Sequence, residues 1–457
     1  HGRQRELLVL KQGQRDEEAI TEERIIMRTT KAVCGLMACA AFAGIALAGP
    51  ITPPPGPVTS TPGPEPRIAI NATNTPGDND GSPSVFKITQ PGSYYLPGNV
   101  TVASGFGIEI DASNVTIDLM GFRLLGQVGS AGGILVQGTE SNITIRNGSV
   151  RSFGGDGISG LNGDAMRVSD FTALNCNGHG VAVGQGSVLV NVVADSNIGT
   201  GIRALTATTL VSCTAHENQG AGIHSDSYAA IVGCTAAANV GDGISAGAYV
   251  TIHACSVTQN GADGVSVGNS STITGSNAAS NASDGFELVG GGSLVADCTA
   301  KSNQDNGIQC QTGDVVTGCS VSLSGNDGIF AGSASLVEGC VVGGSGESGI
   351  VAVNDCTIRG NSCDGNGVDG LFAGIRVIST DNVIDGNRCT DNDYGVQVIA
   401  SGNLIIRNFC SGNTTLNWDI VANNKCLVVA GANAGAISGD SGGVSPGSTN
   451  PWANFTY

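Results

Sequence analysis

The sequence is poor in aromatic and charged residues. Of its 457 residues, 2 are tryptophan, 6 are tyrosine and 11 are phenylalanine. Charged residues make up 13%, about half of the usual quarter, so helices covered with ion pairs are not expected to dominate. Proline is too scarce for a collagen, and there is no Gly-X-Y period. Hydrophobic residues at 40%, with a mean hydropathy of +0.12, exclude a disordered chain.

Basic residues are also few. The chain has 20 lysines and arginines against 38 acidic residues, a net charge of −18. Only three lysines, Lys87, Lys301 and Lys425, follow residue 48. Because no basic stripe is available to neutralise phosphates, no nucleic-acid partner is expected. The acidic balance suits solubility and cation binding instead.

The first 65 residues differ in composition from the rest. Residues 1–26 are charged and are expected to be a non-native upstream segment, with Met27 as the true start. Residues 27–48 resemble a signal peptide, because a basic start precedes an apolar run and a small-residue cleavage site. That run has about 16 residues and a membrane span needs about 20, so no membrane span is expected after signal cleavage. Residues 49–65 are a Pro-rich linker, and the protein is expected to be secreted, periplasmic or at the cell surface.

An internal repeat of about 21 residues organises the remainder. A glycine followed by an apolar residue recurs at Gly107, Gly133, Gly157, Gly180, Gly201, Gly222, Gly243, Gly264, Gly285, Gly307, Gly328, Gly349, Gly370 and Gly395. Four residues earlier, asparagine recurs at Asn197, Asn218, Asn239, Asn260, Asn281, Asn303 and Asn366. Nine residues earlier, cysteine recurs at Cys213, Cys234, Cys255, Cys298, Cys319 and Cys340. Three markers in one register indicate a solenoid.

The repeat length and its alternation select the type of solenoid. A unit of 21 residues is too short for a helix pair, and its apolar residues alternate as in strands. The leucine spacing of leucine-rich repeats is absent, and a coil of 21 residues is not a multiple of the six residues that a hexapeptide β-helix needs. We therefore predict an all-β, right-handed parallel β-helix of about 14–15 coils over residues 66–430, with an N-terminal cap and a Gly/Ser-rich tail at 431–457. One inward column is expected to contain Ile202, Ile223, Ile244, Val265, Phe286 and Ile308.

The coil Asn366–Leu371, with the pattern N-x-x-D-G-I/L, resembles the repeats of the pectate-lyase-like superfamily. The entry segment GSYYLPGNVTV resembles the start of such domains in secreted bacterial proteins. The resemblance covers residues 66–430 and implies the β-helix fold. It does not imply one activity, because the superfamily includes lyases, hydrolases, epimerases and proteins without catalysis.

Thirteen of the 15 cysteines follow the signal peptide. Equivalent positions on adjacent coils lie at about disulfide distance, and export permits oxidation. A small buried residue at a bend is an equally ordinary occupant of this column, so stacked free thiols are favoured over vertical disulfides.

The outward column, two residues after each glycine, is the candidate functional face. Arg203 and His224 are expected to be neighbours there, with Asp226 further along the strand. Such a set could abstract a sugar proton or protonate a leaving group, which makes these three the catalytic candidates. The alternative is a solvated strand face on which the cluster is accidental.

Further candidates are ligand-binding and metal-binding residues. Phe330 and Phe372 would flank Val351 in the outward column as stacking faces for a ligand. The other ligand-binding candidates are Glu287, Tyr228 and Tyr249. No cofactor is required, but Ca²⁺ is possible at Asp242, Asp263 and Asp284 on consecutive coils, where Asp-Gly turn chemistry is the alternative explanation.

Two functions remain open. The first is a monomeric, non-catalytic module that binds an extracellular polysaccharide or another surface component. The second is a polysaccharide lyase, hydrolase or epimerase of the pectate-lyase-like type. The scarcity of lysine and the uniform coils favour the first, because an anionic polymer would need positive charge and active sites usually occupy irregular loops.

Overall fold

The computed structural model describes residues 67–367, 370–430 and 450–456. All regular structure in these ranges is β-strand, and none of it is a helix that could cross a membrane. Residues 65–457 form one compact unit. The expected upstream segment, signal peptide and linker lie outside the described residues, as does most of the tail.

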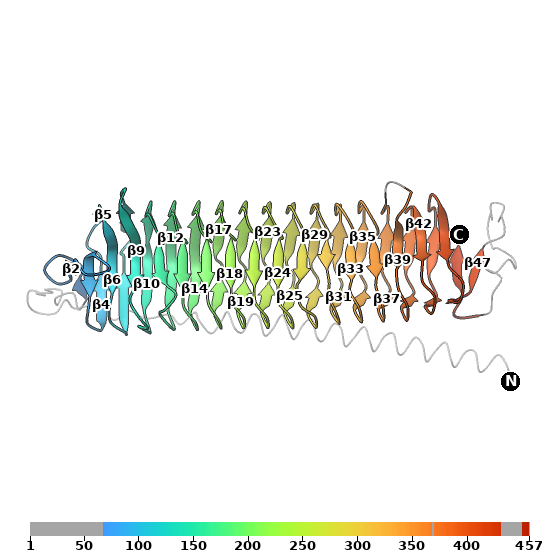
Figure 1. The fold of residues 1–457 in the computed structure, drawn as a ribbon, viewed down its shortest axis with the longest axis horizontal. Coiled ribbons are helices and arrows are strands. Elements are labelled where there is room, and N and C mark those ends of the chain that lie inside the picture. Colours follow the sequence, from blue (N-terminus) through green and yellow to red (C-terminus); the bar gives the residue numbers. More distant parts are fainter. Residues whose placement is uncertain (1–66, 368–369, 431–449, 457) are drawn as a thin grey trace, which may run out of the picture. The chain divides into compact units, whose positions relative to one another are not determined.

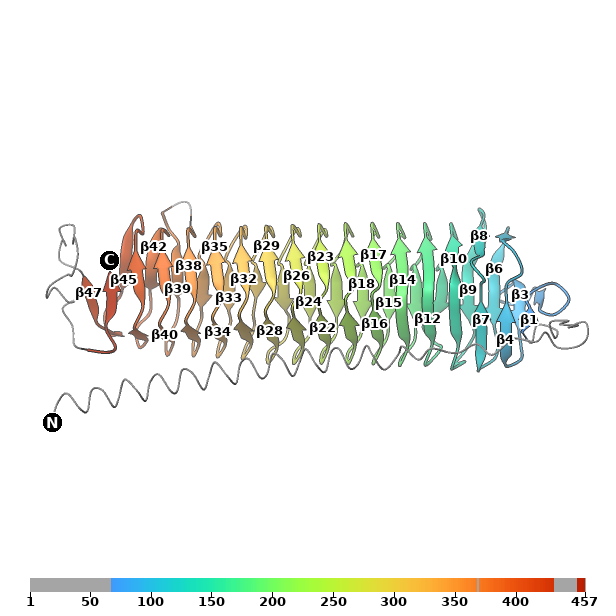
Figure 2. The ribbon, with the colours of Figure 1, turned by 180° about the vertical axis from the view of Figure 1, so that it is seen from behind.

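The strands form a parallel β-helix of about 16 turns, stacked one after another (Figures 1 and 2). A typical turn has three short strands, such as β15 (Ile202–Ala204), β16 (Thr209–Val211) and β17 (Thr214–His216). Strands like β16 and β17 pair from turn to turn in sheet A, and strands like β15 pair in sheet B. The predicted all-β solenoid is confirmed.

Sheet B supplies one strand per turn and carries the candidate face. Its repeat strands are β11 (Ile158–Gly160), β13 (Val181–Val183), β15, β18 (Ile223–Ser225), β21 (Ile244–Ala246), β24 (Val265–Val267), β27 (Phe286–Leu288), β30 (Ile308–Gln309), β33 (Ile329–Ala331), β36 (Ile350–Ala352), β39 (Ala373–Val377) and β42 (Tyr394–Val398).

The core is a set of stacked apolar columns. Each member of the predicted inward column pairs with the next member, and all are fully buried: Ile202, Ile223, Ile244, Val265, Phe286 and Ile308. This follows from the sequence, because an apolar residue after each glycine recurs at every turn and therefore always faces inward. The prediction is confirmed.

The asparagines form a buried ladder. In each step the side-chain Nδ2 donates to the Oδ1 of the next turn, as from Asn218 to Asn239 at 2.9 Å. The same Nδ2 donates to the carbonyl of Ala194 on the turn before, and Oδ1 accepts the preceding asparagine's backbone N–H. The ladder therefore fastens neighbouring turns to one another.

One turn is longer than the repeat predicts, so the residues after it occupy different positions in the coil from those predicted. Ile350 pairs with Ile375, so Gly374 and not Gly370 is the equivalent of Gly349. The extra residues follow the ladder residue Asn366, and Leu371 is 67% exposed instead of inward. Phe372 precedes the outward position, which Arg376 occupies. The D-G-L of residues 369–371 imitates the repeat, whereas the alternating G-I-R-V of 374–377 is the true strand.

The two ends differ from the repeat. Near the N-terminal end, β2 (Pro76–Asp78) pairs antiparallel with β3 (Ser84–Ile88), whose other neighbour, β6 (Gly105–Ile110), is parallel. At the other end, β48 (Asn454–Thr456) pairs with both β44 (Phe409–Ser411) and β47 (Val428–Ala430). Its Asn454 continues a ladder by accepting two bonds from Asn408.

All 13 described cysteines are free thiols, and 12 of them are buried. Besides the six repeat cysteines predicted above, Cys363 pairs with Cys389 and Cys389 with Cys410 in another column. Each repeat thiol also approaches backbone carbonyls, as Cys255 does with His253 at 3.4 Å. The cysteine column thus packs as small apolar residues do.

Candidate functional site

Sheet B places the three catalytic candidates on adjoining strands. Arg203 of β15 and His224 of β18 are register partners, and both point outward because their flanking residues are buried. The Nε2 of His224 lies 3.4 Å from the Oδ1 of Asp226. The side chains of His224 and Asp226 are 31% and 40% exposed. The structure therefore brings together the residues that the sequence grouped.

Their electrostatics favour a neutral imidazole. Burial is the largest effect on His224 and lowers its pKa, and the adjacent Arg203 cation lowers it further. Asp226 acts in the opposite direction but does not outweigh them. At neutral pH the ring can therefore accept a proton or a hydrogen bond. A shallow depression of about 430 Å³ adjoins His224 and Asp226 and is also lined by Thr206, Ser227 and Ser245.

The three candidate metal-binding aspartates form a hydrogen-bonded ladder. The Oδ1 of Asp242 accepts the backbone N–H of Asp263 at 3.2 Å, and the Oδ1 of Asp263 accepts that of Asp284 at 3.0 Å. The column continues from Asp284 to the N–H of Asn306 at 2.8 Å. His179 belongs to the same column, since its Nδ1 accepts the N–H of Thr200. Each side chain thus fixes the turn that follows it.

In this ladder the carboxylates of Asp242, Asp263 and Asp284 do not converge on one point where they could bind a Ca²⁺ ion together. In the described residues, the groups of three acidic, histidine or cysteine side chains with ligand atoms within 4.8 Å of one another do not include them. Carboxylates one turn apart face successive backbone amides rather than a common point. Calcium at these residues stays a prediction.

The outward column of sheet B is polar and acidic in its middle part, around Glu287. Ser266 donates from Oγ to the Oε2 of Glu287 at 2.8 Å, and Asn306 donates from Nδ2 to the Oε1 of Gln309 at 3.0 Å. Burial raises the pKa of Glu287, and the neighbouring Asp263 raises it further. Burial also raises the pKa of Asp284 to about 7. Sequence reasoning missed these shifts because the repeat does not reveal how deeply each turn residue is buried.

The far part of the face is less apolar than predicted. Phe330 and Val351 are register partners in the outward column as expected, but Arg376 follows them where Phe372 was expected. The Nε of Arg376 is buried, with no hydrogen-bond partner in the described part of the chain. The sequence signal that would have found Arg376 is the G-I-R-V alternation described above.

Two tyrosines stand at the edge of the face. Tyr228 and Tyr249 follow β18 and β21, and their rings stack with centroids 5.1 Å apart and planes 4° apart. They are 60% and 50% exposed. The structure thus joins these two ligand-binding candidates into one aromatic surface.

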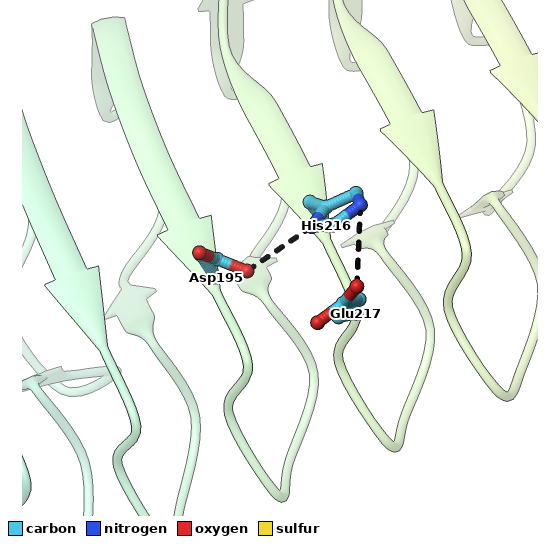
Figure 3. A group of neighbouring side chains, drawn as sticks. All are labelled: Asp195, His216 and Glu217. Carbon is cyan, nitrogen blue, oxygen red and sulfur yellow. Dashed lines mark hydrogen bonds and ion pairs between the residues drawn. The ribbon is translucent and has the colours of Figure 1, made fainter.

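Two clusters elsewhere resemble metal sites. In the first, the ring of His216 lies between Asp195, 3.2 Å from Nδ1, and Glu217, 3.7 Å from Nε2 (Figure 3). The two ring nitrogens face different carboxylates, so the imidazole bridges two acidic side chains rather than sharing one metal ion with them. In the second, Lys87 already occupies the cation position, 2.7 Å from Asp78 and 2.8 Å from Glu109.

Comparisons with known proteins agree with this architecture. The family model described as the right-handed beta helix region matches residues 98–246 and 132–299. No curated protein matches the chain. Among solved structures, the A-module of the Azotobacter vinelandii mannuronan C-5 epimerase AlgE4 is 15% identical, with a TM-score of 0.32, and the match covers 77% of this chain and 86% of that one.

Two further structures are similar at the same low level of identity. Tailspike protein 3 of bacteriophage CBA120 is 14% identical, with a TM-score of 0.38 and coverage of 81% of this chain and 64% of that one. The catalytic domain of a GH87 alpha-1,3-glucanase is 10% identical, with a TM-score of 0.31 and coverage of 79% and 67%. The family match over residues 98–299 agrees with the stacked three-stranded turns of a right-handed parallel β-helix.

Proposed function

We propose that the protein is a secreted, non-catalytic module that binds an extended polysaccharide along the outer surface of sheet B. The outer face is defined here by the outward residues of β15 to β36, from Arg203 to Val351. The proposal concerns an extracellular or cell-surface polymer as the partner.

The unbroken register of this face is the observation that carries the proposal. Arg203, His224, Ser245, Ser266, Glu287, Gln309, Phe330 and Val351 pair one after another without an interruption. Adjacent strands are about 4.8 Å apart, so one hydrogen-bonding or stacking side chain recurs at about the length of one sugar. A regular polymer can therefore make equivalent contacts at successive turns.

The form of the surface supports binding over catalysis. The depression beside His224 is shallow, and its lining residues come from three regular turns rather than from an irregular loop. Catalytic groups usually need an enclosed site from which water is excluded. A polymer lying across many turns needs a long and accessible surface instead.

A polysaccharide array probed with residues 49–457 tests the proposal. Glu287→Gln combined with Ser266→Ala removes the hydrogen-bonded pair at the centre of the face and should weaken binding at least tenfold. His253→Ala removes an exposed side chain of β22 (Thr251–His253) in sheet A and should leave binding unchanged. Equal effects of both variants, or no polysaccharide bound by the parent protein, would contradict the proposal.

A second candidate function is polysaccharide cleavage or epimerisation, favoured by the contact between His224 and Asp226 beside Arg203. The lowered pKa of His224 suits a general base. Turnover by the parent protein, lost in the double variant Arg203→Ala/His224→Ala with an unchanged melting temperature, would establish it. Binding without turnover would leave the module non-catalytic.

A further inference from the structure

The tyrosine pair occupies backbone positions that disfavour it. Tyr228 and Tyr249 have φ angles of +63° and +58°, in the left-handed region. Bulky side chains are genuine outliers there. The equivalent positions of six surrounding turns all have positive φ and hold small residues, namely Gly186, Ala207, Ser270, Gly292, Gly313 and Ala334. The fold therefore does not require an aromatic side chain at either position.

The pair presents aromatic surface to solvent. The two rings cover each other, but both side chains remain at least half exposed. The turn before Tyr228 holds Ala207 and the turn after Tyr249 holds Ser270, so no other large side chain continues the stack. Neither tyrosine hydroxyl forms a hydrogen bond within the described residues. The outer ring faces and the hydroxyl groups are thus available to a ligand.

The depression beside His224 reaches the residues that precede the pair in the chain, because Ser227 and Gly247 line it. Asp226, two residues before Tyr228, is 40% exposed and lines the depression together with His224 and Thr206. A carboxylate, an imidazole and hydroxyls supply the acceptors and donors that sugar hydroxyl groups need. An apolar platform flanked by a few polar groups is the usual composition of a small-ligand site.

The local charge selects the type of sugar. Asp226 and Asp242 lie near His224, and Arg203 is the one cation among the outward residues from Arg203 to Val351 in the described structure. Further along, Asp263 and Glu287 add negative charge. Together with a net charge of −18, this field repels uronates and phosphorylated sugars.

We propose that Tyr228 and Tyr249 are a stacking site for a neutral pyranose unit, whose hydroxyl groups are held by Asp226 and His224. The polysaccharide is accordingly a neutral glycan and not a uronate polymer. This inference rests on the proposed function and identifies the chemical class of its ligand.

Isothermal titration calorimetry on residues 49–457 tests this, with laminarin and a neutral mannan as neutral probes and with alginate and polygalacturonate as anionic ones. We expect the parent protein to bind a neutral probe more tightly than either anionic probe. The double variant Tyr228→Ala/Tyr249→Ala should lose at least tenfold in affinity. Its melting temperature should not fall, because alanine is found at the equivalent position 207.

Leu323→Ala is the matched control, because Leu323 is also bulky, 54% exposed and at a positive φ of 57°, but lies in a different turn column. It should leave affinity unchanged. Tighter binding of an anionic probe would overturn the inference. So would neutral binding that survives the tyrosine changes but is weakened by Glu287→Gln/Ser266→Ala, and that result would leave the proposed function intact. If none of the four probes binds, this inference fails, and the proposed function fails with it only if no polysaccharide on the array binds either.

Discussion

Replacing Asp284 with asparagine should stabilise the protein at high pH and have no such effect at low pH. The side chain of Asp284 is only 6% exposed, and burial raises its pKa from 3.8 to about 7. Its Oδ1 accepts the backbone N–H of Asn306. Asparagine keeps the accepting oxygen and cannot ionise. Asn306 shows that asparagine suits this column, because its Oδ1 accepts the backbone N–H of Asp327 on the next turn.

The sign and size of the effect follow from the pKa. Between pH 4 and pH 7 the folded protein binds this proton more tightly than the unfolded chain, so the contribution of Asp284 to stability is lost as pH rises through that window. A shift of about three units at about 1.4 kcal/mol each gives a loss of about 4 kcal/mol above pH 7. Asp284→Asn should therefore be up to about 4 kcal/mol more stable than the parent at pH 8 and about equal to it at pH 4.

Urea denaturation followed by circular dichroism at pH 4 and pH 8 measures this difference. Asp297→Asn is the matched control, because Asp297 is exposed and its positive φ of 54° suits asparagine equally well. The control should not reproduce the gain at pH 8. If Asp284→Asn is as stable as the parent at pH 8, or less stable, burial does not raise this pKa and the reasoning is refuted.

Three further experiments test the core, the ladder and the thiols. Phe286→Ala should cost about 3–5 kcal/mol of unfolding free energy because its ring is fully buried, whereas Phe409→Ala, at an exposed site, should cost clearly less; equal costs would argue against the core. Asn260→Ala should cost about 3 kcal/mol, since it leaves the backbone N–H and one Nδ2 hydrogen of Asn239 without an acceptor, and a melting temperature equal to the parent's would refute the ladder. Thiol titration of unfolded, unreduced protein should find several free cysteines, and a single one would show oxidised columns.

The fold could be predicted because the repeat contains its physical causes. A glycine, an apolar residue and an asparagine in one register specify a turn, an inward side chain and a ladder at every coil. The long turn could not be placed, because D-G-L at 369–371 satisfies the local pattern and only pairing with β36 shows that Ile375 is the true inward residue. Local sequence cannot distinguish two such registers.

The candidate site was predictable only in part. The proximity of Arg203 and His224 follows directly from the 21-residue spacing. The aspartate ladder does not, because the choice between a turn and a metal site depends on whether the side chains face backbone amides or each other. The proximity of Asp195 and His216 follows from the same spacing, since they are register partners, whereas the contact with Glu217 depends on the turn after β17 (Thr214–His216).

Hydroxyl-radical footprinting with a bound neutral glycan tests the central claim most directly, because it maps which face of the β-helix the polymer covers. A glycan bound along sheet B should protect His224, Tyr228 and Tyr249 and leave the labelling of the exposed His253 on sheet A unchanged. Protection of His253 without protection of the tyrosines would contradict the central claim.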